Sequence, residues 1–293
     1  NLQKNKTKEL KIIFADTADN SGQIKIDFLS FVDIYWKGQI LKNKNEYMNL
    51  HYGGRLFTHY YNKTYKIKDV NEQCSDPIKD KKLLKKIKVC WNMGLCDHGT
   101  YSHIKQKLFS IFRSSIFISN TNSFLYADYH KKYNLSCRIE TNYGRQTVEF
   151  QRKRIKILLK KYTNTYKISR FKYLNEMKKS KCVISPFGWG ELCPRDFETF
   201  LNGGILIKPK MDFFETWPNW YVSKENTSNK KLHTYLSFKW DLSNLENIIH
   251  SVIKKYQDLK YIAKQGQEVY MLYTKGENSK EIFAKRFLKL IKN

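Results

Sequence analysis

The sequence has few residues that interrupt regular structure, and it has no long apolar run. Only 5 of its 293 residues are proline and 13 are glycine, which excludes a collagen-like or Pro/Gly-rich low-complexity chain. No stretch of about eighteen consecutive apolar residues occurs, so we expect no transmembrane helix. The first residues, NLQKNKTKEL, lack the apolar middle of a signal peptide. We therefore expect a cytoplasmic protein, and because the chain lacks an initiator Met we expect that its start is missing.

Cysteine pairs with the spacing of a metal or redox motif are also absent. The six cysteines include no C-x2-C pair and no cluster of the kind that forms a disulfide framework. This pattern favours a reducing compartment. Cys90, Cys96, His98 and His103 lie close together in the sequence, but their spacing matches no zinc pattern. We predict neither a metal site nor a bound cofactor.

Acidic residues are scarce relative to basic ones. The chain has 54 Lys and Arg against 27 Asp and Glu, a net charge of +27. Such an excess is typical of proteins that bind nucleic acid, anionic membranes or anionic substrates. However, 45 of the basic residues are Lys, and Lys, Asn, Ile, Tyr and Phe, whose codons are A/T-rich, are all over-used. The excess of basic residues is therefore explained either by A/T-rich codon usage, which adds Lys to the surface, or by an anionic partner.

The length and the 41% apolar content predict two domains, each with its own core. Alternating apolar strands and helical patterns predict an α/β fold with two Rossmann-like domains that face a cleft. We place the N-terminal domain at 1–125 and the C-terminal domain at 126–278. A last helix at about 279–291, with Asn278 and Glu281 in capping-box spacing, should cross back onto the N-terminal domain. The other predicted strands are 10–15, 85–94, 114–119, 135–140, 181–185 and 205–209, and the other predicted helices are 104–112, 148–162 and one near 245–256.

The segment 181–221 carries the most information about a site. CVIS is a short apolar run that suits a buried parallel strand, and a Gly-containing loop, SPFGWGELC, follows it. Pro194 is well placed as the first residue of a helix, and Gly203 is well placed to end it. The segment therefore predicts a strand, a loop, a short helix and a second buried strand, ILIKP.

The short helix has two unlike faces. Phe197, Phe200 and Leu201 fall on one side, whereas Arg195 and Glu198 fall on the other. The apolar face should pack on the sheet, and the polar face should look out from the strand end, where open α/β sheets bind ligands. An Arg in the first turn is unfavourable for the helix dipole. Its presence there favours a bound anion, with an ordinary exposed ion pair as the alternative.

The motifs SPFGWGE, RDFE, GG-ILIKP-M and TWP resemble the C-terminal half of GT-B glycosyltransferases, most closely the exostosin-like and group-1-like branches. The strong part of the resemblance covers about forty residues, and a weaker part extends over roughly 135–253. It implies a metal-independent glycosyltransferase that takes a sugar from a nucleotide-diphosphate sugar and transfers it to a glycan, lipid or protein acceptor. Consistent with this, Asp16 and Asp19 are one residue too far apart for an Asp-x-Asp metal motif. Glu191 and Glu198 are seven positions apart, whereas many retaining members have two Glu residues eight apart.

The resemblance also implies roles for particular residues. Gly188 and Gly190 would line the diphosphate, Arg195 would neutralise it, and Glu198 would hydrogen-bond the ribose or the sugar. The full set of donor-binding candidates is Tyr143, Arg145, Gly188, Trp189, Gly190, Glu191, Arg195, Asp196, Glu198 and Lys208. The catalytic candidates are Asp19, His98, Glu191, Arg195 and Glu198, among which Asp19 and His98 are rival general bases.

Two other functions stay open at this point. The chain could be a non-catalytic sugar-nucleotide-binding or scaffold protein, or a basic nucleic-acid-binding protein. The polybasic helix 148–162 could face an anionic membrane or nucleic acid, or it could be an ordinary solvated face. Because no RNP, KH or helix-turn-helix signature is present, we expect no specific nucleic-acid partner.

Overall fold

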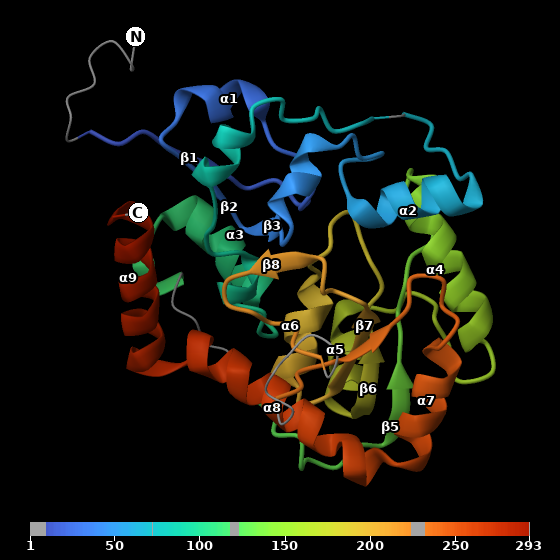
Figure 1. Cartoon of the computed structure of the whole chain (residues 1–293). Helices are drawn as coiled ribbons and strands as arrows, with labels where there is room; N and C mark the ends of the chain where they lie inside the picture. The colour runs from blue at the N-terminus through green and yellow to red at the C-terminus, as the bar shows by residue number, and fades with distance from the viewer. Residues whose placement is uncertain (1–9, 72, 118–122, 224–231, 293) are drawn as a thin grey trace.

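The N-terminal part of the fold is built on a small parallel sheet. The computed structural model describes residues 10–71, 73–117, 123–223 and 232–292 (Figure 1). The strands β1 (Ile13–Asp16), β2 (Ile34–Lys37) and β4 (Ile87–Val89) pair in parallel in the order β1-β2-β4. All four residues of β2 are buried, because both faces of this central strand are covered.

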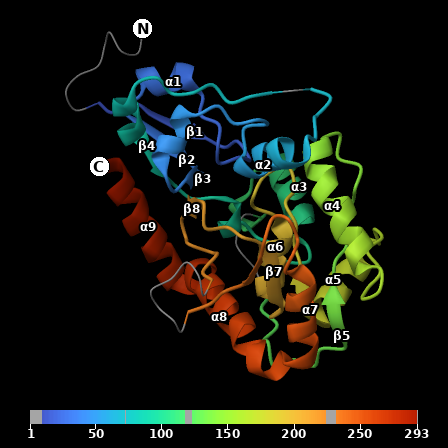
Figure 2. The ribbon, with the colours of Figure 1, turned by 45° about the vertical axis from the view of Figure 1, so that its right-hand side comes forward.

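The last helix, α9 (Gly276–Lys292), covers one of those faces. Ile34 and Trp36 of β2 pack in one cluster with Leu290 of α9, while Tyr35 points to the other side and joins a separate core. In Figure 2 α9 runs from the end of α8 up to the N-terminal strands. The predicted return of the last helix to the N-terminal sheet is therefore confirmed. The helix starts at Gly276, so Asn278 lies inside it, and the expected capping box at Asn278 is wrong.

A two-stranded antiparallel sheet joins the two halves of the chain. β3 (Gln39–Leu41) pairs with β8 (Phe214–Thr216), with Ile40 opposite Glu215. Since β8 comes after the predicted boundary at residue 125, a segment from the second half of the chain lies beside an N-terminal strand. The boundary itself stays a prediction.

The C-terminal part of the fold is a four-stranded parallel sheet. Ile205 and Ile207 of β7 pack on one side of the sheet with α4 and α7, and Leu206 packs on the other side with α6 and α8, as the alternation of side chains along a strand requires. The predicted α/β class with separate parallel sheets is thus confirmed. The strands, in sheet order, are β5 (Tyr133–Ser136), β6 (Ser180–Ile184), β7 (Ile205–Pro209) and β9 (Leu236–Phe238).

Most of the described helices follow the sequence pattern, but those before residue 66 and the one at Arg170–Lys178 were not predicted, and one predicted strand is wrong. Residues 115–117, expected to form a strand within 114–119, form a 3-10 helix, and 118 and 119 lie outside the described residues. The remaining α-helices are α1 (Ile26–Phe31), α2 (Leu56–Tyr65), α3 (Ser102–Phe112), α4 (Gln146–Leu159), α5 (Arg170–Lys178), α6 (Pro194–Leu201), α7 (Leu245–Lys254) and α8 (Tyr256–Thr274). Further 3-10 helices span Lys44–Met48, Lys81–Lys86 and Met93–Leu95.

Candidate functional site

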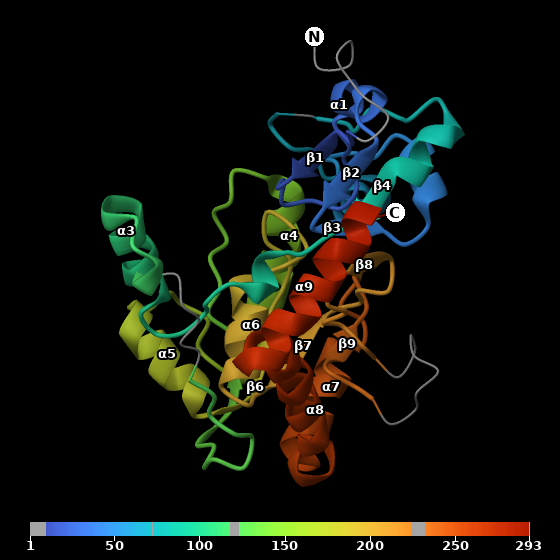
Figure 3. The same ribbon diagram turned by 90° about the vertical axis from the view of Figure 1, so that its left-hand side faces the viewer.

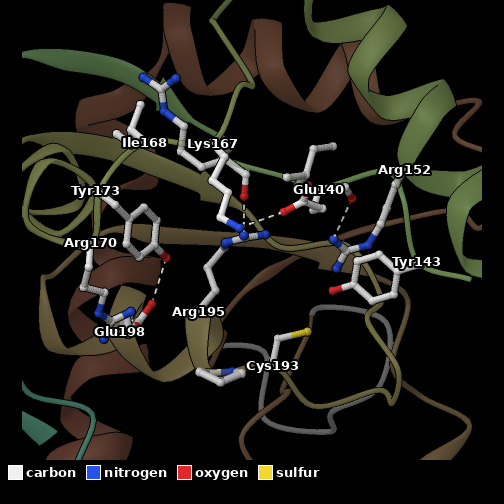
Figure 4. Close-up of a pocket in the computed structure, with 13 residues that line it drawn as sticks. Glu140, Tyr143, Arg152, Lys167, Ile168, Arg170, Tyr173, Cys193, Arg195 and Glu198 are labelled. Carbon is white, nitrogen blue, oxygen red and sulfur yellow. Dashed lines mark hydrogen bonds and ion pairs between the residues drawn. The ribbon is translucent and has the colours of Figure 1, made fainter. Parts of the chain in front are cut away.

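A cavity of about 420 Å³ lies beyond the carboxyl ends of β5 and β6, where parallel α/β sheets bind ligands. Its walls come from the loop after β5, from α4, from the start of α5 and from the first turns of α6 (Figure 4). The residues that line it are Arg138, Ile139, Glu140, Tyr143, Arg152, Lys167, Ile168, Arg170, Tyr173, Cys193, Pro194, Arg195 and Glu198.

Arg195 extends from the first turn of α6 into this cavity, as the sequence predicts (Figure 4). Pro194 is the first residue of the helix, and the apolar face with Phe197 and Phe200 is buried in the core. This packing fixes the opposite face toward the cavity. Nη2 of Arg195 donates a hydrogen bond to the carbonyl oxygen of Arg138. Its Nε is buried and has no hydrogen-bond partner among the described residues.

Arg152 is a second cavity arginine, and sequence reasoning missed it as a site residue. It is buried on α4 and donates from Nε to the carbonyl of Phe187 at 2.8 Å and from Nη1 to the carbonyl of Glu140 at 3.1 Å. Its guanidinium lies 4.2 Å from the ring centroid of Tyr143. A signal was available, because Arg152 shares the inward stripe of the helix with Ile155 at i+3.

Positive charge exceeds negative charge in the cavity. Five of the lining side chains are cationic and two are carboxylates. Three of the cations form ion pairs: Arg138 with Glu176, Lys167 with Glu140, and Arg170 with Glu198.

Arg152 and Arg195 are the two cations left over. Within the described part of the chain neither forms an ion pair with a carboxylate. Arg152 donates to main-chain carbonyls, and Arg195 donates to one main-chain carbonyl and to the hydroxyl oxygen of Tyr173. Arg152 is buried and Arg195 is partly buried, and cations withdrawn from water without a counter-charge are unfavourable. Their convergence on one cavity therefore indicates a site for an anion with about two negative charges.

Glu198 is held in the cavity wall by two partners. Its Oε1 is 2.6 Å from Nη1 of Arg170, and the hydroxyl of Tyr173 donates to its Oε2 at 2.8 Å. Burial raises the pKa of the Tyr173 hydroxyl, which keeps this group a hydrogen-bond donor. Glu198 is buried yet charge-paired, so its carboxylate is positioned before any ligand arrives.

A second cavity of about 570 Å³ shares Arg170, Pro194 and Glu198 with the first. His98 lines it from the N-terminal half and stacks on Phe197. Its Nε2 is 2.8 Å from the carbonyl oxygen of Met93; a carbonyl only accepts, so Nε2 carries the proton and Nδ1 the lone pair. Burial lowers the pKa of His98, so the neutral form is the dominant one at pH 7.

The Gly-containing loop between β6 and α6 lies beside the first cavity. A Cβ at Gly188 would meet the Sγ of Cys193 at 3.5 Å and Nη2 of Arg152 at 3.6 Å, so this glycine is close to the cavity arginine. Trp189 lies near Tyr143, with ring centroids 6.0 Å apart, and the guanidinium of Arg145 lies 5.0 Å from the Trp189 ring centroid. These side chains extend the cavity rim with aromatic and cationic groups.

Gly190 and Asp19 are in contact with each other. A Cβ at Gly190 would lie 1.9 Å from Oδ1 of Asp19, and the N–H of Gly190 donates to the Asp19 carboxylate. Loss of hydration raises the pKa of this carboxyl, which Arg55 partly offsets. Asp19 is therefore next to the glycine loop but is not among the residues that line the first cavity.

Three other predicted residues are buried away from the cavity. Glu191 is fully buried and accepts from Oγ of Ser21 at 2.7 Å and from Nε2 of Gln39 at 3.0 Å; burial raises its pKa. Lys208 and Asp196 are also fully buried, with Nζ and Oδ2 3.0 Å apart. Lys208 thus pairs with Asp196 inside the core, and its role at a phosphate stays a prediction. Glu191 and Glu198 do not line the same cavity.

Among the described residues, no group of three or more His, Cys, Asp or Glu side chains comes together in a way that could hold a metal ion. The helices in that part of the chain include none long and apolar enough to cross a membrane.

No protein-family model matches the chain, and no curated protein matches it. Two crystal structures of HepE from Anabaena are among the solved structures similar to it. The complex of HepE with UDP and glucose is 11% identical, covers 96% of this chain and 71% of HepE, and has a TM-score of 0.44. The complex of HepE with UDP-glucose is 12% identical, covers 96% of this chain and 72% of HepE, and has a TM-score of 0.44.

Proposed function

We propose that the chain is a glycosyltransferase that binds a nucleotide-diphosphate sugar in the cavity lined by Arg152 and Arg195. The observation that supports this is the pair of guanidinium groups without a counter-charge at the carboxyl edge of a parallel sheet. A diphosphate carries about two negative charges and matches the fork geometry of arginine. The exostosin-like or group-1-like branch of the GT-B enzymes is part of this proposal.

The arginines would act mainly on the leaving group. As the bond between the sugar and the diphosphate breaks, negative charge grows on the diphosphate, and donors fixed in place stabilise that charge. Arg195 would supply this with its guanidinium, which extends into the cavity. Gly188 has no side chain to keep the phosphates away from Arg152. In this proposal the reaction needs no metal, and added EDTA should leave the rate unchanged.

Glu198 and Arg170 would change partners when the donor binds. The guanidinium of Arg170 faces both cavities through its pair with Glu198. A diphosphate would compete for Arg170, and Glu198 would then accept a hydrogen bond from a sugar or ribose hydroxyl. The shared wall would thus couple donor binding to the second cavity.

His98 is the better placed of the two candidate bases. It lines the second cavity together with Glu198, and its neutral imidazole can accept a proton from an acceptor hydroxyl. Asp19 is the rival, at the glycine loop. The second cavity would hold the acceptor.

The test is a panel of UDP-, GDP-, dTDP- and CMP-sugars with thermal unfolding as readout, followed by assay of nucleotide release with and without acceptor extracts. We expect one donor at about a hundred times its Kd to add roughly 2.7 kcal/mol of stability. A donor that binds without any nucleotide release would favour the non-catalytic alternative. If no donor stabilises the protein but duplex DNA or RNA does at physiological salt, the proposal is wrong and the nucleic-acid alternative holds.

A further inference from the structure

Helix α3 presents an apolar face to solvent. It projects at the edge of the molecule near α5 (Figure 3), and only Ser102 of its residues is buried. Ile111 and Phe112 are 64% and 63% exposed, and Ile104 is exposed as well. These three residues fall on one side of a helix, since they are seven and eight positions apart. Large apolar side chains gathered on one exposed face mark an interaction surface.

The charged side chains of α3 itself are all cationic, and one of them, Lys105, is paired with Asp97. The sequence contains no Asp or Glu between Asp97 and Asp128. Lys107 and Arg113 are exposed at the side and at the end of the helix. A helix with exposed Ile and Phe beside Lys and Arg, and without carboxylates, complements a surface that is anionic above and apolar below.

We propose that α3 docks on an anionic lipid bilayer, with Ile104, Ile111 and Phe112 inserted and with Lys107 and Arg113 against the headgroups. A second copy of the chain fits this face poorly, because a two-fold contact would bring the same cations together. Nucleic acid fits it poorly too, because two of these three residues are isoleucines, which offer no ring on which bases stack.

The docking helix is also part of the wall of the second cavity. Ser102, His103 and Gln106 of α3 line that cavity together with Glu198. Ser102 and Gln106 lie on the side of α3 opposite Ile104, so docking would hold the cavity about one helix diameter, roughly 10 Å, above the bilayer surface. If the proposed function holds, on which this step alone rests, the acceptor is a hydroxyl group carried by a membrane lipid.

The experiment is co-sedimentation of the full chain with vesicles, without any donor sugar. Wild type should bind vesicles of phosphatidylcholine with about 30% phosphatidylglycerol and should bind weakly to phosphatidylcholine alone. The double variant Ile111→Asp/Phe112→Asp should lose about tenfold or more in partition. Lys107→Ala should lose about fivefold on anionic vesicles. All variants should keep the wild-type thermal midpoint, because the replaced side chains are exposed.

The matched control is Ile157→Asp on α4. Ile157 is 65% exposed on the polybasic helix that the sequence offers as the rival membrane face, and its loss should leave partition unchanged. The proposal is overturned if wild type and the α3 double variant bind the anionic vesicles equally. It is also overturned if Ile157→Asp reduces vesicle binding. If wild type is a dimer and the α3 double variant is a monomer, the membrane proposal is wrong and the face binds a second copy of the chain. None of these outcomes depends on donor binding, so the two proposals can fail separately.

Discussion

Replacing Arg195 by Ala removes one of the two cavity cations that lack a counter-charge. A charge-assisted contact to an anion is worth roughly 1.5–3 kcal/mol, so the Kd for the donor should rise by about 10- to 150-fold. At a donor concentration of about a hundred times the wild-type Kd, the wild type gains roughly 2.7 kcal/mol from binding. The variant should gain only about 0.3–1.4 kcal/mol at that same concentration.

Folding should change little in this variant. The side chain of Arg195 lies opposite the apolar face of α6, and its described hydrogen bonds go to the main-chain carbonyl of Arg138 and to the hydroxyl of Tyr173. Removing it also removes a cation without a carboxylate partner. The thermal midpoint without donor should therefore stay within a few degrees of wild type, because about 1 kcal/mol moves the midpoint of a large domain by roughly 2–4 °C.

The assay is thermal unfolding with and without the donor, backed by isothermal titration. Arg195→Lys should recover part of the affinity, because an ammonium keeps the charge but cannot form a bidentate fork. Lys153→Ala is the control, since Lys153 lies on the exposed side of α4 in an i,i+4 pair with Glu149. If Arg195→Ala keeps the whole donor-induced shift, or unfolds without donor, then Arg195 is structural and the donor site lies elsewhere.

Two further predictions concern the loop between β6 and α6. Gly190→Ala should destabilise the protein by roughly 1–3 kcal/mol, because its Cβ would lie 1.9 Å from Oδ1 and 2.5 Å from the carbonyl oxygen of Asp19. In urea unfolding the control Gly188→Ala should be nearly neutral, because the nearest contact of its Cβ would be 3.5 Å. Equal losses of stability in the two variants would contradict this packing. Burial raises the pKa of Glu191 above its ordinary 4.5, so the folded state binds the proton of this carboxyl more tightly than the unfolded state does. Wild type should therefore lose stability relative to Glu191→Gln as the pH rises from about 4.5 toward the raised pKa. A difference between the two proteins that does not vary from pH 4 to 8 would show that Glu191 is not held in this way.

The sequence predicted the segment 181–209 well because its signals are local. Apolar runs bounded by Pro and Gly define β6 and β7, and Pro194 marks the start of α6. The side of α6 that faces the cavity follows from the 3.6-residue period alone. The placement of Arg195 and Glu198 in one cavity was therefore predictable.

Long-range pairing was not predictable in the same way. The central strand β2 ends in Lys37, which is fully buried because its Nζ lies 2.6 Å from Oδ2 of Asp16. No local pattern shows that a lysine will find a carboxylate twenty-one positions earlier, so IYWK does not read as a strand. The pairing of Lys208 with Asp196 was unpredictable for the same reason. Arg152 was not recognised as a site residue, because the other basic residues of α4 made it part of an apparent basic surface.

The order in which the chain is synthesised has a consequence for how the N-terminal sheet matures. Its covering helix α9, and β8, the partner of the neighbouring strand β3, are among the later segments to leave the ribosome. Until then Trp36 and the neighbouring strand residues have no helix over them, and β3 has no partner strand. The first sheet to be made is thus covered only late, and during translation its uncovered face is open to chaperones and to misassembly.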